Sequence, residues 1–167
     1  SYFGDLLAEI EHARASIDVE TYIFNRDEFG REVEQALIRA VQRGVHVRVL
    51  VDGIGAWGWI AKGGRELLAG GVEIRIYHAI SPTFLIMRAL LNFRRVSKVL
   101  LRLNRRNHRK VWILDSRTAW VGSMNIAAYH LNKYHGDQAW RDTGVRVEGE
   151  QISLLEWAFL HVWTRSS

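Results

Sequence analysis

The chain has 167 residues, of which 48% are hydrophobic and one is proline. This size and composition predict a single folded domain over residues 1–167 with an ordinary buried core, and they argue against disorder. Because the chain has no cysteine, disulfides, thiol catalysis and cysteine-based metal centres are excluded. The first residues lack a signal-peptide pattern, and no apolar run reaches the roughly 18 residues of a membrane span. We therefore expect a cytoplasmic or peripheral membrane location.

Positive charge is concentrated in one stretch of the sequence. The net charge is +5, and residues 74–114 contain ten Lys and Arg side chains but no Asp or Glu. A contiguous positive stretch of this kind predicts a polyanionic partner, which is an anionic phospholipid, a nucleic acid or another phosphorylated substrate.

Helical and strand patterns alternate along the chain. The patterns predict helices at 5–14, 30–44, 65–69 and 151–163, and strands at 16–24, 45–51, 72–77, 107–114, 118–122 and 143–147. The strand at 45–51 is nearly continuous in β-branched and apolar residues, which suits a parallel strand covered on both faces. We therefore predict an α/β fold with a mixed, largely parallel β-sheet flanked by helices on both faces.

Residues 83–106 form a basic amphipathic segment within this domain. Apolar side chains repeat on one side at helical spacing, and arginines gather on the other. Three interpretations stay open: a helix packed on the sheet, an interfacial helix on anionic lipid, or a nucleic-acid face. The candidate membrane or polyanion contacts are Arg88, Arg94, Arg95, Lys98 and Arg102.

The chemical signal is the spacing H-x-K-x-x-x-x-D at His108, Lys110 and Asp115. Side chains two apart on a strand point to the same face, so His108 can attack a phosphorus atom whose oxygen Lys110 holds. Asp115 falls on the opposite face, roughly 23 Å away at about 3.3 Å per residue. We therefore expect Asp115 to bond backbone groups of the turn at 116–117, while another carboxylate orients His108.

A second polar group follows the next predicted strand, at Gly122-Ser123-Met124-Asn125. Two antiparallel strands joined by a short turn bring this end back beside His108. The Asn125 amide and the Ser123 hydroxyl are donors for phosphate oxygens, and Gly122 permits close backbone approach.

The motif HRKVWILD followed by VGSMN resembles the HKD signature of the phospholipase D superfamily with its trailing G-S-x-N. The stretches IDVETYIF, VHVRVLVDGIG and WRDTGVRVEG agree with that resemblance, which covers nearly the whole chain. Within the superfamily the chain is most similar to the amino-terminal half of bacterial cardiolipin synthases.

The resemblance implies a two-histidine mechanism without a metal or other cofactor. One histidine attacks phosphorus to form a phosphohistidine, and the other protonates the leaving alcohol. The resemblance also implies an acidic residue that holds the tautomer of the nucleophile, for which Asp142 is the candidate and Glu20 the alternative. Because this chain carries one signature, the site is expected to need a second HKD domain, either in the same polypeptide or in a homodimer.

Other candidate residues carry weaker signals. Trp57 and Trp59 lie in a glycine-rich turn after a parallel strand, where they are placed to contact acyl chains or glycerol or to pack against a partner domain. His135 and Asp137 are candidates for the mouth of the site, although a solvated loop is favoured. The remaining histidines show no metal-ligand spacing and are expected at the surface or the edge of the core: His12, His46, His78, His130 and His161.

Three functions remain open from the sequence. The first is phosphatidyl transfer of the cardiolipin synthase type at a membrane surface, through His108, Lys110 and Asn125. The second is a homodimeric phosphodiesterase or nuclease that uses the same site. The third is an inactive half-domain that binds phosphate without turnover.

Overall fold

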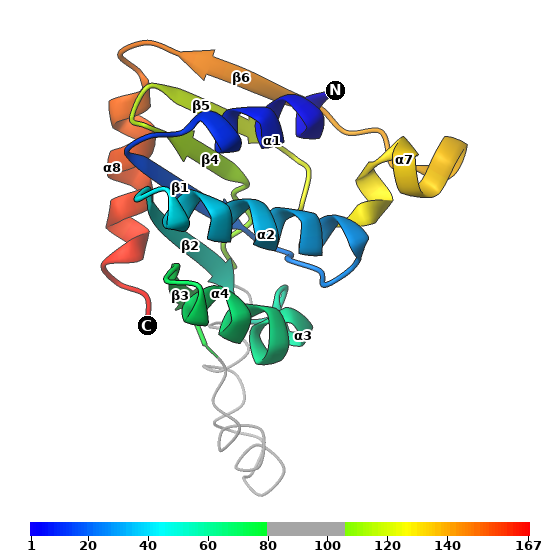
Figure 1. Cartoon of the computed structure of the whole chain (residues 1–167), viewed down its shortest axis with the longest axis horizontal. Helices are drawn as coiled ribbons and strands as arrows, with labels where there is room; N and C mark the ends of the chain where they lie inside the picture. The colour runs from blue at the N-terminus through cyan, green and yellow to red at the C-terminus, as the bar shows by residue number, and fades with distance from the viewer. Residues whose placement is uncertain (80–105) are drawn as a thin grey trace, which may run out of the picture.

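A computed structural model describes residues 1–79 and 106–167 of the chain. Six strands form one sheet, and helices lie on both of its faces (Figure 1). The strands lie side by side in the order β3-β2-β1-β4-β5-β6. Their bounds are β1 Ser16–Thr21, β2 His46–Asp52, β3 Glu73–Tyr77, β4 Val111–Leu114, β5 Thr118–Gly122 and β6 Gly144–Glu148.

The sheet is mixed, as predicted, but its parallel part is smaller than expected. Strand β2 pairs parallel with both β1 and β3. The other three pairs, β1 with β4, β4 with β5 and β5 with β6, are antiparallel. The turn at residues 115–117 explains the β4–β5 pair, because a tight turn can join only antiparallel neighbours.

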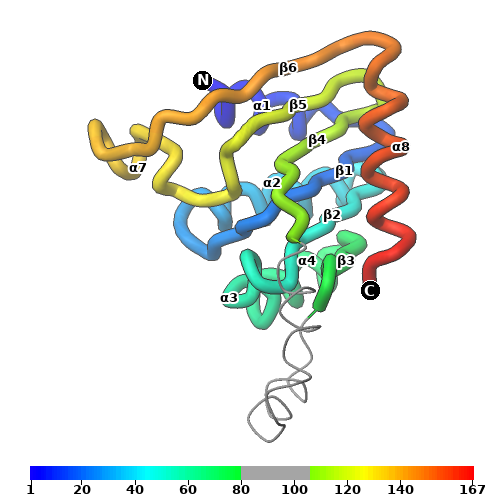
Figure 2. The backbone as a smooth tube through the Cα atoms, turned by 180° about the vertical axis from the view of Figure 1, so that it is seen from behind, coloured from blue at the N-terminus to red at the C-terminus, as the bar shows by residue number. Residues whose placement is uncertain are grey.

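Long helices cover the two faces of the sheet. Helices α1 and α2 lie on one face, and α8 crosses the other, as the front and back views show (Figures 1 and 2). Within 1–79 and 106–167, no helix combines the length and the apolarity needed to cross a membrane. The helices are α1 Tyr2–His12, α2 Glu28–Gln42, α3 Trp57–Trp59, α4 Arg65–Ala69, α7 Asn132–His135 and α8 Ile152–Trp163, with a π-helical turn at Ile60–Gly64.

Alternation along β1 separates two cores. Ile17 and Val19 are fully buried among side chains of α1 and α2. Asp18 and Glu20 are buried on the α8 side, where Arg48 binds Asp18 through two hydrogen bonds of 2.6 and 2.7 Å. The Arg48 guanidinium also lies 5.4 Å from the centre of the Phe159 ring of α8. The α8 face is therefore apolar in the main but contains paired charges.

Two predicted strands are shorter than expected at the ends that meet near the signature. The strand predicted at 16–24 ends at Thr21, and the strand predicted at 107–114 begins at Val111. Residues 106–110 are instead held by side-chain contacts described below. Pairing continues in part, because the Gly122 N–H donates to the Lys110 carbonyl at 3.3 Å. His108 and Lys110 thus precede β4 in the connection that enters it.

Candidate active site

The carboxyl ends of β1 and β2 meet the segment that enters β4. Tyr22 follows β1, and Asp52 is the last residue of β2. The Asp52 carboxylate accepts hydrogen bonds from the N–H groups of Ile54 and Gly55 at 2.8 and 3.2 Å, and from Asn107 N–H at 3.3 Å. A Cβ on Gly55 would lie 2.2 Å from the Tyr22 carbonyl oxygen, so this close approach requires glycine. Asp52 therefore fixes the turn beneath Tyr22 and the start of the signature segment together.

His108 is exposed at this edge of the sheet. Its imidazole stacks on the Tyr22 ring with centroids 4.1 Å apart and an interplanar angle of 20°. His108 also lines a cavity of about 560 Å³ that extends toward α8. The described residues that line the cavity are Tyr77, Arg106, Asn107, His108, Arg109, Trp157, Ala158, His161 and Val162. The arrangement leaves the imidazole supported from one side and open to a ligand.

Lys110, like His108, lies beside the Tyr22 ring. Its Nζ is 5.5 Å from the centre of the Tyr22 ring and donates a hydrogen bond to the His108 carbonyl at 2.6 Å. Burial lowers the pKa of Lys110, and the Asp142 carboxylate opposes that shift. A partly desolvated ammonium beside an open imidazole is suited to bind a phosphate oxygen.

Asn125 and Ser123 follow β5 and are fixed by neighbouring strands. The Asn125 side-chain oxygen accepts the Ile23 N–H at 3.1 Å, and a side-chain hydrogen bond joins Asn125 to Tyr129. The Ser123 hydroxyl donates to Asp142 at 2.7 Å. Asn125 thus joins the end of β5 to the segment after β1, while Ser123 holds Asp142.

Asp142, the candidate for orienting His108, contacts other groups. Its two carboxylate oxygens lie 2.7 Å from Ser123 Oγ and 2.7 Å from His130 Nδ1. In the described part of the chain no hydrogen bond joins Asp142 to His108. The carboxylate acts electrostatically on Lys110 instead. Asp142 thus belongs to the same cluster as the signature but has a different immediate partner from the one expected.

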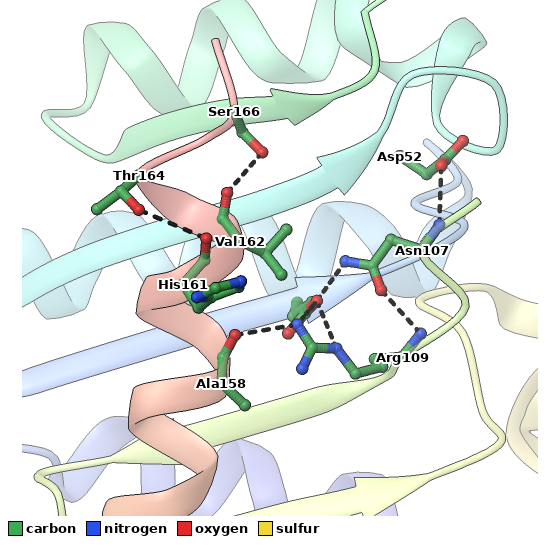
Figure 3. A network of polar contacts seen from close by, with 9 residues as sticks. Asp52, Asn107, Arg109, Ala158, His161, Val162, Thr164 and Ser166 are labelled. Atoms are coloured by element: carbon green, nitrogen blue, oxygen red, sulfur yellow. Dashed lines mark hydrogen bonds and ion pairs between the residues drawn. The ribbon is translucent and has the colours of Figure 1, made fainter. Parts of the chain in front are cut away.

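Glu20, the alternative candidate, contacts the two neighbours of His108. It is 2% exposed and accepts hydrogen bonds from the Asn107 amide and from Arg109 Nε, the latter at 3.0 Å. Arg109 also donates to the Ala158 carbonyl of α8 at 3.2 Å, and Figure 3 shows Asn107 and Arg109 converging in this network. Burial raises the pKa of Glu20, while Asn107 and Arg109 oppose the shift. Glu20 therefore anchors the segment that carries His108, without touching its ring.

Asp115 bonds backbone groups, but not those of its own turn. Its carboxylate accepts the N–H groups of Arg14, Ala15 and Ser16 at distances from 2.7 to 3.1 Å. The expected bonds to the turn at 116–117 are replaced by this link to the connection between α1 and β1. Burial raises the pKa of Asp115, but these three donors and the Arg117 charge together outweigh burial and hold the pKa below its ordinary value. The last residue of the signature lies beyond the far end of β4 from His108.

His130 is a member of the cluster that sequence reasoning missed. Its side chain is 2% exposed, with Nδ1 2.7 Å from the Asp142 carboxylate. Its Nε2 accepts the Asn125 N–H at 3.1 Å. No spacing rule marks His130. The available signal was its position between the two site segments that contain Asn125 and Asp142.

The weaker aromatic candidates separate into a core residue and a surface residue. Trp59 is 2% exposed, stacks on Phe24 and donates to buried Glu34 at 2.6 Å. The expectation that Trp59 contacts a ligand or a partner domain is therefore wrong, because its own core encloses it. Trp57 is 49% exposed and stays a candidate.

The remaining candidates add no described contact to the cluster. His135 and Asp137 are exposed on α7 and the turn after it. Arg88, Arg94, Arg95, Lys98 and Arg102 lie outside the described residues. Across 1–79 and 106–167, no group of three or more His, Asp or Glu side chains is placed to hold a metal ion.

Two solved structures share this fold. Nuc from Salmonella typhimurium, a phospholipase D family member, matches with a TM-score of 0.70 and 19% identity over 100% of this chain and 90% of that chain. NucT from Helicobacter pylori matches with a TM-score of 0.62 and 14% identity over 99% of this chain and 89% of that chain. The fold is therefore that of a phospholipase D-like domain.

Sequence comparison assigns the family within that class. The family model described as "Cardiolipin synthase, PLD-like domain" matches residues 6–163, and the chain belongs to this family. The cardiolipin synthase of Geobacillus kaustophilus is 34% identical over 163 residues, which are 96% of this chain and 29% of that protein. The cardiolipin synthase of Clostridium perfringens is 36% identical over 164 residues, 98% of this chain and 31% of that protein. The chain thus spans less than a third of the length of these relatives.

Proposed function

We propose that the chain supplies one half of a phosphodiester-transfer site, and that the reaction is phosphatidyl transfer of the cardiolipin synthase type. The observation that carries the proposal is the position of His108. Its exposed imidazole is stacked on Tyr22 and lines the cavity, and the Lys110 ammonium lies beside the same Tyr22 ring. Membership of the cardiolipin synthase family supports a phosphatidyl group as the group transferred.

The reaction divides into two displacements at phosphorus. In the first, an imidazole nitrogen forms a bond to phosphorus while the bond to the leaving alcohol oxygen breaks, and a second imidazole gives that oxygen its proton. In the second, the acceptor hydroxyl loses its proton to the second imidazole and its oxygen displaces the histidine nitrogen. His108 and its counterpart in a second domain share the two roles, because imidazole can serve either one near neutral pH.

Lys110 and Asn125 would stabilise the charge that develops on the phosphate oxygens. Lys110 is partly desolvated, so its attraction to an anion is stronger than in bulk water. The Asn125 amide nitrogen, just after β5, would supply a neutral donor. Asp52 and Glu20 hold the segment that carries His108 and Lys110, through contacts with Asn107 and Arg109.

A second HKD domain and an anionic phospholipid are the partners that this function requires. The chain carries one signature and spans 29% to 31% of its cardiolipin synthase relatives. The second domain would come either from the same longer polypeptide or from another copy of the chain. The basic segment at 83–106 would hold the protein at an anionic membrane surface as a peripheral protein.

The substrate is tested by offering two phosphodiesters to the same protein. The chain, alone and together with a second domain that carries the signature, is incubated with phosphatidylglycerol vesicles and with single-stranded DNA. We expect lipid turnover that His108→Ala abolishes, because the imidazole takes part in bond formation or in proton transfer. His12→Ala is the control, since His12 is exposed and bonds its own helix at Ala8.

Other outcomes select the other functions. DNA cleavage without lipid turnover would replace phosphatidyl transfer by a nuclease. A strictly monomeric chain that turns over neither substrate, even with the second domain present, would make it an inactive half-domain.

A further inference from the structure

The connection between Asn125 and Asp142 contains a buried histidine that the proposed reaction does not use. The His130 side chain is 2% exposed and lies against the Tyr129 ring at 4.4 Å and the Trp140 ring at 6.0 Å between centroids. A titratable group is rarely buried to this extent without a polar task. His130 therefore differs from the exposed His12 and His135 of the same chain.

The polar contacts of His130 define a single tautomer. Nε2 accepts the Asn125 N–H at 3.1 Å, so this nitrogen carries no proton. The proton of the neutral ring is then on Nδ1, which lies 2.7 Å from the Asp142 carboxylate. The ring thus accepts a hydrogen bond from the strand end that carries Asn125, and its Nδ1 lies beside the carboxylate of Asp142, two residues before β6. Protonation would remove the acceptor and break the first contact.

The partners of His130 lead directly to the phosphate site. Asp142 also accepts the Ser123 hydroxyl at 2.7 Å and acts on the Lys110 ammonium. The Asn125 side-chain oxygen accepts the N–H of Ile23, the residue after Tyr22. His130 consequently ties the anionic neighbour of Lys110 to the backbone of the amide donor.

We infer that His130 is a positioning residue of the phosphate site, whose Nδ1–H tautomer holds the Asp142 carboxylate and the Asn125 backbone in a fixed relation to Lys110. The inference rests on the proposed function for its catalytic consequence, but its geometry is independent of the substrate. Burial lowers the pKa of His130, although the Asp142 carboxylate opposes this shift. Because the pKa is lowered, the ring is neutral at pH 7. Lys110 and Tyr129 are the other titratable groups that face it.

Three substitutions separate the two contacts. His130→Asn keeps a donor where Nδ1 stands and loses the acceptor toward Asn125. His130→Gln keeps an acceptor near Nε2 and loses the donor toward Asp142. His130→Phe keeps the volume and loses both. His12→Phe is the matched control, because His12 is exposed on α1 and has no contact with the cluster in the described residues.

The first test is spectroscopic and needs no turnover. In the whole chain labelled with ¹⁵N-histidine, long-range ¹H–¹⁵N spectra at pH 7 should include the signal of a neutral Nδ1–H ring that is absent in His130→Asn and in His130→Gln. The ¹³Cε titration of Lys110 should shift to lower pH in His130→Gln and His130→Phe, because Asp142 is no longer held. His130→Asn and His12→Phe should leave that titration close to wild type. An Nε2–H or doubly protonated His130 at pH 7, or an unchanged Lys110 titration in all variants, would overturn the inference.

The second test measures catalysis on phosphatidylglycerol vesicles with the second domain present. We expect kcat to fall about 10- to 100-fold in His130→Gln and His130→Phe with KM within about twofold, since supporting contacts of this kind act on geometry. A wild-type kcat in both variants would overturn the positioning role. Absence of turnover in the wild type would instead count against the proposed function, and the spectra would still decide the role of His130. If His130→Phe does not fold, the Asn and Gln variants carry the comparison.

Discussion

At the residue scale, Asn125 shows how one side chain combines structure with a proposed chemical role. Its oxygen accepts the Ile23 N–H at 3.1 Å, and this contact joins the end of β5 to the segment after β1. The backbone of the two segments is also linked, because Ile126 N–H donates to Ile23 at 3.1 Å. The amide nitrogen is thereby on the side of the group away from Ile23.

Asn125→Asp should separate these two functions. Aspartate keeps the oxygen that accepts Ile23 N–H, so the unfolding midpoint should change little. It loses the proposed phosphate donor and places a negative charge beside a phosphate, so kcat should fall about 100-fold or more. Steady-state turnover of phosphatidylglycerol and thermal unfolding check the two parts. Wild-type turnover in this variant would remove Asn125 from the proposed site.

Individual residues differ in how far the sequence could place them. The two-residue spacing predicted that His108 and Lys110 lie close together, and both are beside the Tyr22 ring although neither lies on a strand. The immediate partner of Asp142 was not predictable, since the groups around it come from separate parts of the chain. They are Ser123, His130 and Lys110. His130 carries no local pattern, and only its burial in the folded chain distinguishes it from the exposed histidines.

At the element scale, the turn between β4 and β5 is hydrogen-bonded to the connection between α1 and β1, near the N-terminus. Asp115 and Ser116 both have φ of 53°, and Arg117 N–H donates to the Leu114 carbonyl at 3.0 Å. The Asp115 carboxylate spans to the three N–H groups between α1 and β1. The signature aspartate therefore sets the position of β4 against β1.

Asp115→Asn should weaken the fold while leaving the chemical groups in place. Asparagine tolerates positive φ, but its NH₂ group opposes the Arg14 N–H, and the charge that strengthens the other bonds is lost. We expect the free energy of unfolding to fall by about 1–3 kcal/mol at pH 7, as measured by urea unfolding.

The same variant has a defined pH dependence. The pKa of Asp115 is lowered in the folded chain, so its contribution is complete above the unfolded pKa of about 3.9 and disappears as the pH falls through the folded value. The difference in the free energy of unfolding between wild type and Asp115→Asn should therefore become smaller below about pH 4. A constant difference across this range would contradict the assigned role of the carboxylate.

Elements were predicted better than the contacts between them. The order of helices and strands follows from periodicity and agrees with the fold. The strand ends at Thr21 and Val111 were misplaced, because side-chain contacts such as those of Asn107 and Arg109 with Glu20 hold the chain before β4 in place of ladder bonds. The Trp59 interpretation failed for a similar reason, because the buried Glu34 that accepts its N–H is 25 residues away in the sequence.

At the scale of the whole molecule, the asymmetry of charge gives a prediction about membranes. Replacing five basic residues of the 83–106 segment by Gln should weaken binding to phosphatidylglycerol vesicles at least about tenfold, since each such charge contributes about 1 kcal/mol near an anionic surface. Sedimentation with vesicles at low and high salt measures the effect. The substituted residues are Arg88, Arg94, Arg95, Lys98 and Arg102.

A variant of equal charge provides the control for this experiment. Five exposed basic residues outside the stretch are replaced by Gln, and binding should remain closer to wild type. Equal losses in the two variants would show that net charge alone, and not the segment, determines binding. The control positions are Arg14, Arg31, Lys62, Arg117 and Arg165.

The most direct test of the account is the chemical nature of the enzyme-bound phosphoryl group. The chain, with its second domain, is given phosphatidylglycerol labelled at phosphorus, quenched in alkali and divided between alkaline and acidic conditions. The account predicts a protein-bound label that survives alkali, is lost in acid as a phosphohistidine is, and fails to form in His108→Ala, because both histidines are needed for the first displacement. A label that withstands acid, or one that forms normally in His108→Ala, would contradict it.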